Sequence, residues 1–213
     1  MTHYHHSLYK KIFNYSLTLF LIFLTIVPCL IISFLIKISS KGKVFFTQVR
    51  VGEDRKKFTI YKFRTMKEGS EKQIIKYRSL NEADGPVFKI KNDPRFTKIG
   101  KILSKTGLDE LPQLINVFKG EMNLVGPRPL PEYEFIKLTK QQQSRNVIKP
   151  GITSLWVICG SHNLSFKDWM KLDQKYINEG NIWVDFYIIF QTILILIRTT
   201  VSYIVHNIRK FLG

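Results

Sequence analysis

Cysteine is scarce in this 213-residue chain, which has only Cys29 and Cys159. Two cysteines cannot build a disulfide framework or a zinc site, and the count is compatible with a reducing compartment. Histidine is also sparse, but three of the five histidines, His3, His5 and His6, lie together near the start. We expect a disordered polar tail there, with a metal-binding tract as the alternative.

The common catalytic signatures are missing as well. The sequence has no Gly-x-x-x-x-Gly-Lys-[Ser/Thr], no Gly-x-Gly-x-x-Gly, no Gly-x-Ser-x-Gly and no His-Glu-x-x-His. It therefore gives no sign of the usual nucleotide-binding loops, serine hydrolases or zinc proteases. Its aromatic residues are not interleaved with basic ones as a stacking platform, so we expect no nucleic-acid partner.

Negative charge is in short supply. Against 33 Lys and Arg there are 16 Asp and Glu, which gives a formal net charge of +17. Such a balance indicates an anionic partner, which could be nucleic acid, anionic lipid or a phosphorylated substrate. The length suffices for one domain with a core and a membrane segment.

The longest stretch without charge runs from Ile12 to Ile36. It exceeds the ~20 residues that cross a bilayer as a helix, and no small-x-small cleavage site of a signal peptide follows it. Pro28 interrupts the run and should bend the helix. Basic residues flank both ends (Lys10, Lys11, Lys37, Lys41 and Lys43), which would keep both ends in the cytoplasm. A re-entrant helix and a kinked single-pass anchor fit these residues equally well.

The rest of the chain alternates strand and helix patterns. Residues 44–51 and 58–64, joined by a polar turn, predict a β-hairpin on which Lys62 and Arg64 share a face. The region 182–205 is apolar, but charges interrupt it, so an amphipathic helix on the core or in the membrane interface is expected. Further predicted elements are helices at Ser70–Leu80, Phe96–Lys105, Pro131–Arg145 and Ser165–Asn178 and a strand at Val87–Ile90.

An acidic pair, Asp109 and Glu110, stands out in this basic chain. Pro112 is acceptable only in the first turn of a helix, which places Asp109 or its immediate neighbour at a helix start. Free backbone N–H groups and the helix dipole favour an ionised carboxylate there by about 0.3–1 kcal/mol. Taken alone, the pair is more simply explained as a helix cap beside a surface residue. The apolar spacing predicts that the side of this helix bearing Ile115 is buried.

Arg128 lies between two prolines, in Gly126-Pro127-Arg128-Pro129. The prolines restrict the backbone, so the guanidinium is held on a stiff loop. A planar, always-charged fork of donors suits a carboxylate or a phosphate.

Several of these stretches together resemble one family, the bacterial sugar transferases of the small monotopic phosphoglycosyl transferase type. The similarity is colinear from about residue 8 to residue 203. The matching stretches are Val44–Gly52, Tyr61–Met66, Leu108–Met122, Val125–Pro129 and Lys149–Thr153.

The resemblance implies an α+β, mainly helical fold. Residues 1–43 would form a basic N-terminus and a re-entrant membrane helix broken at Pro28, although the family often has Ser where this chain has Val27. Residues 44–213 would form a cytoplasmic, membrane-associated catalytic domain with a β-hairpin, a helical core and an amphipathic C-terminal helix. The expected location is the bacterial inner (cytoplasmic) membrane.

The resemblance also implies a reaction. Asp109 would attack the β-phosphate of a UDP-sugar, UMP would leave, and polyprenyl (undecaprenyl) phosphate would take the phosphosugar from the aspartyl intermediate. Mg²⁺ would be required and Asp109 would contact it, while the role of Glu110 stays open. A carboxylate nucleophile divides one difficult displacement into two steps, and attack on an anionic diphosphate needs neutralising charge. One or two carboxylates with substrate phosphates are the usual Mg²⁺ ligands.

The expected phosphate-binding residues are basic and lie within or near these stretches. They are Arg128, Lys105, Lys62, Arg64 and Lys149. In two places the sequence departs from the family: Lys105 and Ser104 stand where an arginine is usual, and Cys159-Gly160-Ser161 replaces an Asn-Gly-Arg turn. Alternatives to the enzyme are a non-enzymatic basic adaptor that binds anionic lipid or a partner assembly, and a membrane-tethered nucleic-acid binder. A homodimer is compatible with the resemblance.

Overall fold

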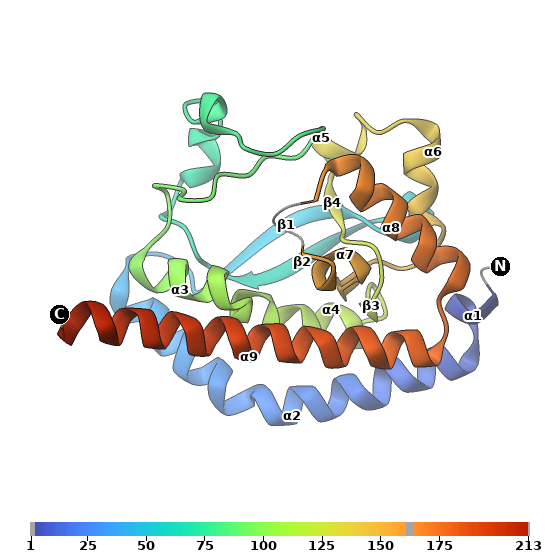
Figure 1. The fold of residues 1–213 in the computed structure, drawn as a ribbon, viewed down its shortest axis with the longest axis horizontal. Helices are drawn as coiled ribbons and strands as arrows, with labels where there is room; N and C mark the ends of the chain where they lie inside the picture. The colour runs from blue at the N-terminus through green and yellow to red at the C-terminus, as the bar shows by residue number, and fades with distance from the viewer. Residues whose placement is uncertain (1–2, 161–163, 213) are drawn as a thin grey trace.

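The computed structural model describes residues 3–160 and 164–212 and has an α+β fold in which helices predominate. Two long helices, α2 (Leu8–Ser39) and α9 (Ile182–Leu212), lie along one edge of the molecule, and a small sheet and shorter helices lie on the other side of them (Figure 1). Both begin at the same end, where Phe13 and Phe186 pack with ring centroids 4.8 Å apart. The expected α+β, mainly helical architecture is confirmed, whereas the re-entrant form of the N-terminal helix and its break at Pro28 stay predictions.

The N-terminal histidines do not form a disordered tail, so that expectation is wrong. They form a short helix, α1 (His3–His6), because His5 is buried against the protein. Its Nε2 lies 3.1 Å from the carbonyl oxygen of Ile177, and its ring packs on Tyr176. Over residues 3–160 and 164–212 no group of three or more His, Cys, Asp or Glu side chains could hold a metal ion, which also leaves the metal tract without support.

Helix α2 includes the whole predicted apolar run. Ser7 caps its start by accepting a hydrogen bond from the amide of Lys10, as serine commonly does at this position. Pro28 lies inside the helix, and Figure 1 shows α2 bending along its length rather than running straight. Whether α2 re-enters or crosses a bilayer stays a prediction.

The hairpin is confirmed. Strands β1 (Phe45–Val51) and β2 (Lys57–Phe63) pair antiparallel, with Phe45 opposite Phe63, and a 3₁₀ turn, η1 (Glu53–Arg55), joins them. The two-residue strand β4 (Leu130–Pro131) pairs with the other edge of β1, so the sheet order is β2-β1-β4. This pairing brings the chain that follows Arg128 beside the hairpin.

A second, two-stranded sheet fixes the other side of the Arg128 loop. Strand β3 (Asn123–Val125) runs parallel to β5 (Gly151–Thr153), and the amide of Gly151 donates to the carbonyl of Pro127 over 3.0 Å. A Cβ atom on Gly151 would lie 2.0 Å from the nitrogen of Gly126, so only glycine allows this approach. The loop 126–129 is therefore held from both sides.

Residues 70–90 differ from the prediction. The predicted helix is reduced to two 3₁₀ turns, η2 (Ser70–Gln73) and η3 (Arg78–Leu80), and the predicted strand at residues 87–90 is wrong. The Asn81 side chain accepts a hydrogen bond from the amide of Lys89 over 2.7 Å and donates to the carbonyl of Ala83 over 3.0 Å. Such side-chain bonds compete with a strand ladder and fold the segment into a loop.

Helix α3 (Lys98–Thr106) is confirmed, and its Thr97 cap accepts from the amide of Gly100. A 3₁₀ helix, η4 (Leu108–Gln113), and a short α-helix, α4 (Leu114–Phe118), follow. The predicted burial of Ile115 is wrong: its side chain is 44% exposed, whereas Leu114 and Val117 are buried. A 3₁₀ segment has three residues per turn, which rotates the later positions away from the face that an unbroken α-helix predicts.

The C-terminal half consists mostly of short helices. The predicted helix 131–145 is divided because Thr139 and Gln142 form a capping box that starts a new helix. The helix predicted from Ser165 is confirmed with that serine as its cap. The bounds are α5 (Glu132–Phe135), α6 (Lys140–Gln143), η5 (Ser144–Val147), α7 (Leu155–Ile158) and α8 (Phe166–Glu179).

The main core joins the hairpin to α4, β3, α8 and α9, and includes Ile60, Leu114, Val125, Tyr176 and Ile188. In contrast, α2 and α9 leave most of their apolar side chains exposed. Both helices are long and apolar enough to cross a membrane. Only 11% of the most apolar 18-residue stretch of α2, and 6% of that of α9, is buried inside the protein.

Candidate active site

The acidic pair lies in η4, directly after Gly107, whose φ of +70° reverses the chain between α3 and η4. Gly107 is the residue at the start of η4, and no side chain caps that start. The helix-cap explanation of Asp109 is therefore wrong. Because the sheet strand β2 packs on η4, the pair is held beside the hairpin instead of at a solvated helix end.

Glu110 is an acceptor for two cations from different parts of the fold. Lys62 Nζ, on β2, lies 2.6 Å from Glu110 Oε1, and Arg128 Nη1, on the loop after β3, lies 3.4 Å from the same oxygen. The Arg128 guanidinium also lies over the ring of Trp156, with 5.9 Å to its centroid. The glutamate thus orients both basic side chains beside Asp109.

The two neighbouring carboxyl groups have opposite pKa shifts. Burial raises the pKa of Asp109 to about 6, and the negative charge of Glu110 adds to this against the attraction of Lys62 and Arg128. Burial also opposes ionisation of Glu110, but Lys62 and Arg128 outweigh it and lower its pKa to about 2. Neighbouring titratable groups whose pKa values are shifted in opposite directions are typical of catalytic sites.

A small hollow, open to solvent, lies beside Glu110. Two polar residues in its wall, Arg50 on β1 and Gln113 at the end of η4, were missed by sequence reasoning. Both lie in the stretches that resemble the family, but neither spacing nor composition distinguishes them from their neighbours. The full lining is Arg50, Ile60, Lys62, Glu110, Gln113, Arg128, Pro129, Gly151 and Ile152.

The structure brings Asp109, Glu110, Lys62 and Arg128 together. It places Arg64 elsewhere: Nη2 donates to the carbonyl oxygen of Ser40 over 3.0 Å and Nη1 to that of Lys41, so Arg64 caps the C-terminal end of α2. Lys62 and Arg64 therefore have different partners, Glu110 for Lys62 and the end of α2 for Arg64.

Two other basic residues of the predicted set also lie outside the hollow. Lys105 Nζ lies over the ring of Tyr203 on α9, 5.7 Å from its centroid. Lys149 extends toward Gly120, where its Nζ would be 3.7 Å from an added Cβ atom. Phosphate binding by Arg64, Lys105 and Lys149 stays a prediction, and these contacts give it no support.

The carboxylates of the site suit Mg²⁺. Glu110 is engaged by Lys62 and Arg128, whereas Asp109 makes no ion pair with any residue that the structure describes. An open set of one or two carboxylates is the usual protein share of a Mg²⁺ site, with water and substrate phosphates as the remaining ligands. Asp109 is therefore the residue best suited to contact the ion.

The site thus places a carboxylate with a raised pKa beside two basic side chains, on a fold with two exposed apolar helices. Comparison with known proteins gives its class. Residues 5–199 match the bacterial sugar transferase family, and the chain belongs to this family.

Its relatives include proteins of different length. The galactosyl transferase CpsE of Streptococcus agalactiae is 44% identical over 160 residues, which cover 75% of this chain and 36% of that protein. The exopolysaccharide production protein ExoY of Rhizobium meliloti is 36% identical over 168 residues, covering 77% and 74%. The UDP-glucose:undecaprenyl-phosphate glucose-1-phosphate transferase of Escherichia coli is 35% identical over 184 residues, covering 83% and 37%. The chain thus spans about a third of the length of two of these proteins.

The membrane association of the chain follows from two independent observations. Helices α2 and α9 have the length and composition of membrane segments and leave those apolar surfaces outside the protein core. One relative, from Erwinia amylovora, is named a UDP-galactose-lipid carrier transferase, and the Escherichia coli relative is named for transfer to undecaprenyl phosphate. The chain is accordingly a membrane protein.

Proposed function

We propose that this chain is a phosphoglycosyl transferase that moves a sugar-1-phosphate from a UDP-sugar to polyprenyl phosphate. The reaction would be the first membrane step in the synthesis of a surface polysaccharide or glycoconjugate. The observation that carries the proposal is the pair at residues 109 and 110: Asp109 has a raised pKa, and Glu110 fixes two cations beside it, in a chain of the sugar transferase family.

In the first step an oxygen of the Asp109 carboxylate attacks the β-phosphorus of the UDP-sugar. The bond between that phosphorus and the bridging oxygen breaks, and UMP leaves with the electron pair. In the second step a phosphate oxygen of polyprenyl phosphate attacks the same phosphorus, and Asp109 is released as a carboxylate. Two displacements each have a lower barrier than direct transfer between two anions.

Lys62 and Arg128 neutralise charge in this scheme. Both bind Glu110 and so need little reorganisation when phosphate oxygens arrive. Arg128, on its braced loop, offers a planar fork to a phosphate, whereas Lys62 supplies a point charge. When bound, Mg²⁺ would add charge neutralisation at the diphosphate. Glu110 is a positioning residue for the two cations.

The test is UMP release from a UDP-sugar, followed by transfer of radiolabel to polyprenyl phosphate over a panel of UDP-sugars. Asp109→Asn should abolish UMP release, because an amide is not a nucleophile of comparable strength. The matched control is Asp168→Asn, on the exposed side of α8, which should leave turnover unchanged. Near wild-type turnover by Asp109→Asn would refute the nucleophile, and vesicle binding without any UMP release by the unmodified chain would favour a non-enzymatic adaptor.

The metal has its own test. EDTA should stop UMP release, and added Mg²⁺ should restore it. Turnover that persists in EDTA would overturn the requirement for a divalent ion while leaving Asp109 as the nucleophile.

We further propose that α2 is re-entrant and that the site faces the cytoplasm at the inner membrane. The basic residues after α2 and the bend of a helix that contains Pro28 support this. Reporters fused before residue 3 and at Gly42 should both be cytoplasmic. A periplasmic N-terminal reporter would show that α2 spans the bilayer.

A further inference from the structure

The hollow beside Glu110 contains more positive than negative charge. Arg50, Lys62 and Arg128 line it, against the single carboxylate of Glu110. Lys62 and Arg128 both bind that carboxylate, so its charge is already shared between two partners. A partly buried site with surplus positive charge is favourable for an anion.

Gln113 is an unusual residue for this wall. Its side chain is 2% exposed, yet its Nε2 has no hydrogen-bond partner among the described residues. A contact from the Gln113 side chain helps to lower the pKa of Glu110, but it does not satisfy Nε2 as a hydrogen bond. Leaving a buried amide unpaired is unfavourable, so a ligand that accepts from Nε2 would explain its presence.

Arg50, which also lines the hollow, has the same feature. Its Nη1 donates to the carbonyl of Pro129 over 3.1 Å, which braces the loop that carries Arg128. Its Nε is buried and has no partner in the described part of the chain. Burial lowers the pKa of Arg50 to about 10, and the nearby charge of Arg128 contributes. Two cations side by side are stabilised by a shared anion.

We propose that Arg50 Nε and Gln113 Nε2 together bind the oxygens of a phosphoryl group, which forms a phosphate subsite in the hollow beside Glu110. This inference rests on the proposed function, which supplies two phosphoryl ligands: the diphosphate of the UDP-sugar and the phosphate of the lipid acceptor. A guanidinium edge and an amide donor suit either, because both ligands present several acceptor oxygens. Lys62 and Arg128 then act on the reacting phosphate, and Arg50 and Gln113 hold its position.

The decisive variant is Gln113→Met, which keeps the length of the side chain and removes its donor. It should unfold at the same temperature as the unmodified protein or higher, because an unpaired buried amide is lost. KM for either the UDP-sugar or polyprenyl phosphate should rise about tenfold or more, the loss expected for one hydrogen bond to a charged group. Gln141→Met on the exposed surface of α6 is the matched control and should change neither quantity.

The two substrates are separated by measuring the two half-reactions. UMP release without lipid reports on the UDP-sugar, and transfer from the loaded enzyme to polyprenyl phosphate reports on the lipid. Arg50→Lys keeps a positive charge and a donor for Pro129 but lacks Nε, so it should raise the same KM as Gln113→Met. Unchanged KM values for both substrates in both variants would overturn the subsite while leaving the transferase intact.

A binding measurement keeps this test independent of turnover. Inorganic pyrophosphate should raise the unfolding temperature of the unmodified protein, and Gln113→Met and Arg50→Lys should lose most of that rise. This result would support the subsite even if no UDP-sugar were turned over. Equal stabilisation of all three proteins, or of none, would overturn it.

Discussion

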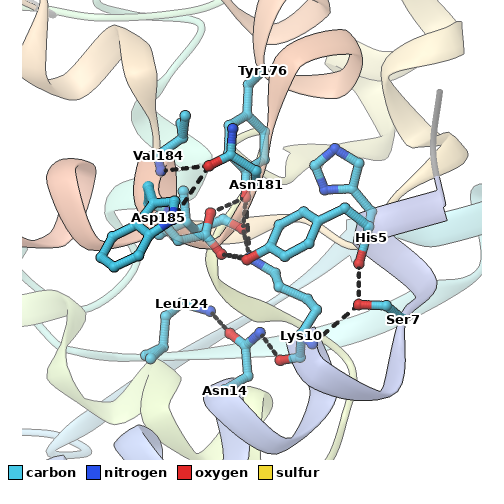
Figure 2. A network of polar contacts seen from close by, with 12 residues as sticks. His5, Ser7, Lys10, Asn14, Leu124, Tyr176, Asn181, Val184 and Asp185 are labelled. Carbon is cyan, nitrogen blue, oxygen red and sulfur yellow. Dashed lines mark hydrogen bonds and ion pairs between the residues drawn. The ribbon is translucent and has the colours of Figure 1, made fainter.

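Two clusters of buried charge in this fold differ in how fully their polar atoms are bonded. The first joins α2 to α9, where Lys10 is 1% exposed and Asp185 is fully buried. Lys10 Nζ binds Asp185 Oδ2, the hydroxyl of Tyr176 at 3.0 Å and the carbonyl of Val125 at 3.4 Å. Figure 2 shows this cluster, with Lys10 extending toward Asp185 and Tyr176.

The other partners complete this first cluster. The hydroxyl of Tyr4 donates to Asp185 Oδ2 over 2.6 Å, and Tyr176 lies 2.6 Å from Oδ1. Asn14, one turn after Lys10, accepts from the amide of Leu124 over 2.7 Å (Figure 2). The cluster thereby ties α1, α2, β3, α8 and α9 together.

The second cluster, around Glu110, is incomplete by comparison. It opens into a hollow lined by more cations than carboxylates, and its buried donors on Arg50 and Gln113 lack partners within residues 3–160 and 164–212. The difference indicates different roles. The Lys10 cluster is satisfied within the protein and holds the long helices to the core, whereas the Glu110 cluster is satisfied only when a ligand supplies acceptors.

Lys10→Met should have the largest effect on stability. It leaves the Asp185 carboxylate buried without its cation, and breaking a fully buried pair in this way costs about 3–5 kcal/mol. The unfolding temperature, measured in detergent or nanodiscs, should fall by many degrees. The double variant Lys10→Met with Asp185→Leu should recover most of the loss, since no charge stays buried. A Lys10→Met protein as stable as the unmodified one would contradict the assigned role.

Asp109→Asn should show the opposite behaviour in the second cluster. Burial raises the pKa of Asp109, so its ionisation destabilises the folded state progressively above the usual aspartate pKa and in full above about pH 6. The asparagine variant should therefore unfold at a higher temperature at pH 7, despite its loss of activity. The difference should shrink as the pH falls through 6 and vanish near the usual aspartate pKa of about 4. A lower unfolding temperature at pH 7 would show that Asp109 is structural.

The pH dependence of kcat/KM gives a smaller, directional test. Asp109 must be ionised to attack, so the acid limb should lie at about pH 6. Glu110→Gln removes a negative charge that raises the pKa of Asp109, so the limb should move to lower pH as overall turnover falls. Asp168→Asn should leave the limb in place. A shift to higher pH would show that Glu110 does not act on Asp109 through its charge.

The sequence predicted the second cluster far better than the first. Asp109, Glu110 and Arg128 lie in local motifs, and the alternation of residues 58–64 placed Lys62 on a strand. Lys10 and Asp185 are 175 positions apart, and each had an ordinary local explanation, as a flanking charge and as an interruption of an apolar helix. Only tertiary packing pairs them.

This pairing changes how the membrane segments are interpreted. Lys10 is one of the basic residues before the apolar run, but Asp185 neutralises its charge inside the protein. The basic residues that favour a cytoplasmic start of α2 are therefore fewer. Asp185 is one of the charges that interrupt the apolar region 182–205, but its side chain is buried and does not face outward. The site shows the same limit of sequence-based prediction. Only burial and hydrogen-bond partners reveal that Arg50 and Gln113 line the hollow, whereas Arg64 caps the end of α2.

The smallest effect expected is that of Tyr4→Phe, which tests how cooperative the first cluster is. The ring keeps its packing on His5, and only the hydroxyl that donates to Asp185 is lost. Because Lys10 and Tyr176 still bind that carboxylate, the loss should be near the lower end for a hydrogen bond to a charged group, about 1.5 kcal/mol, and turnover should not change. Denaturant unfolding of Tyr4→Phe, with Tyr9→Phe on the exposed side of α2 as the control, measures it. A loss as large as that of Lys10→Met would mean that the carboxylate stays buried only when all its donors are present.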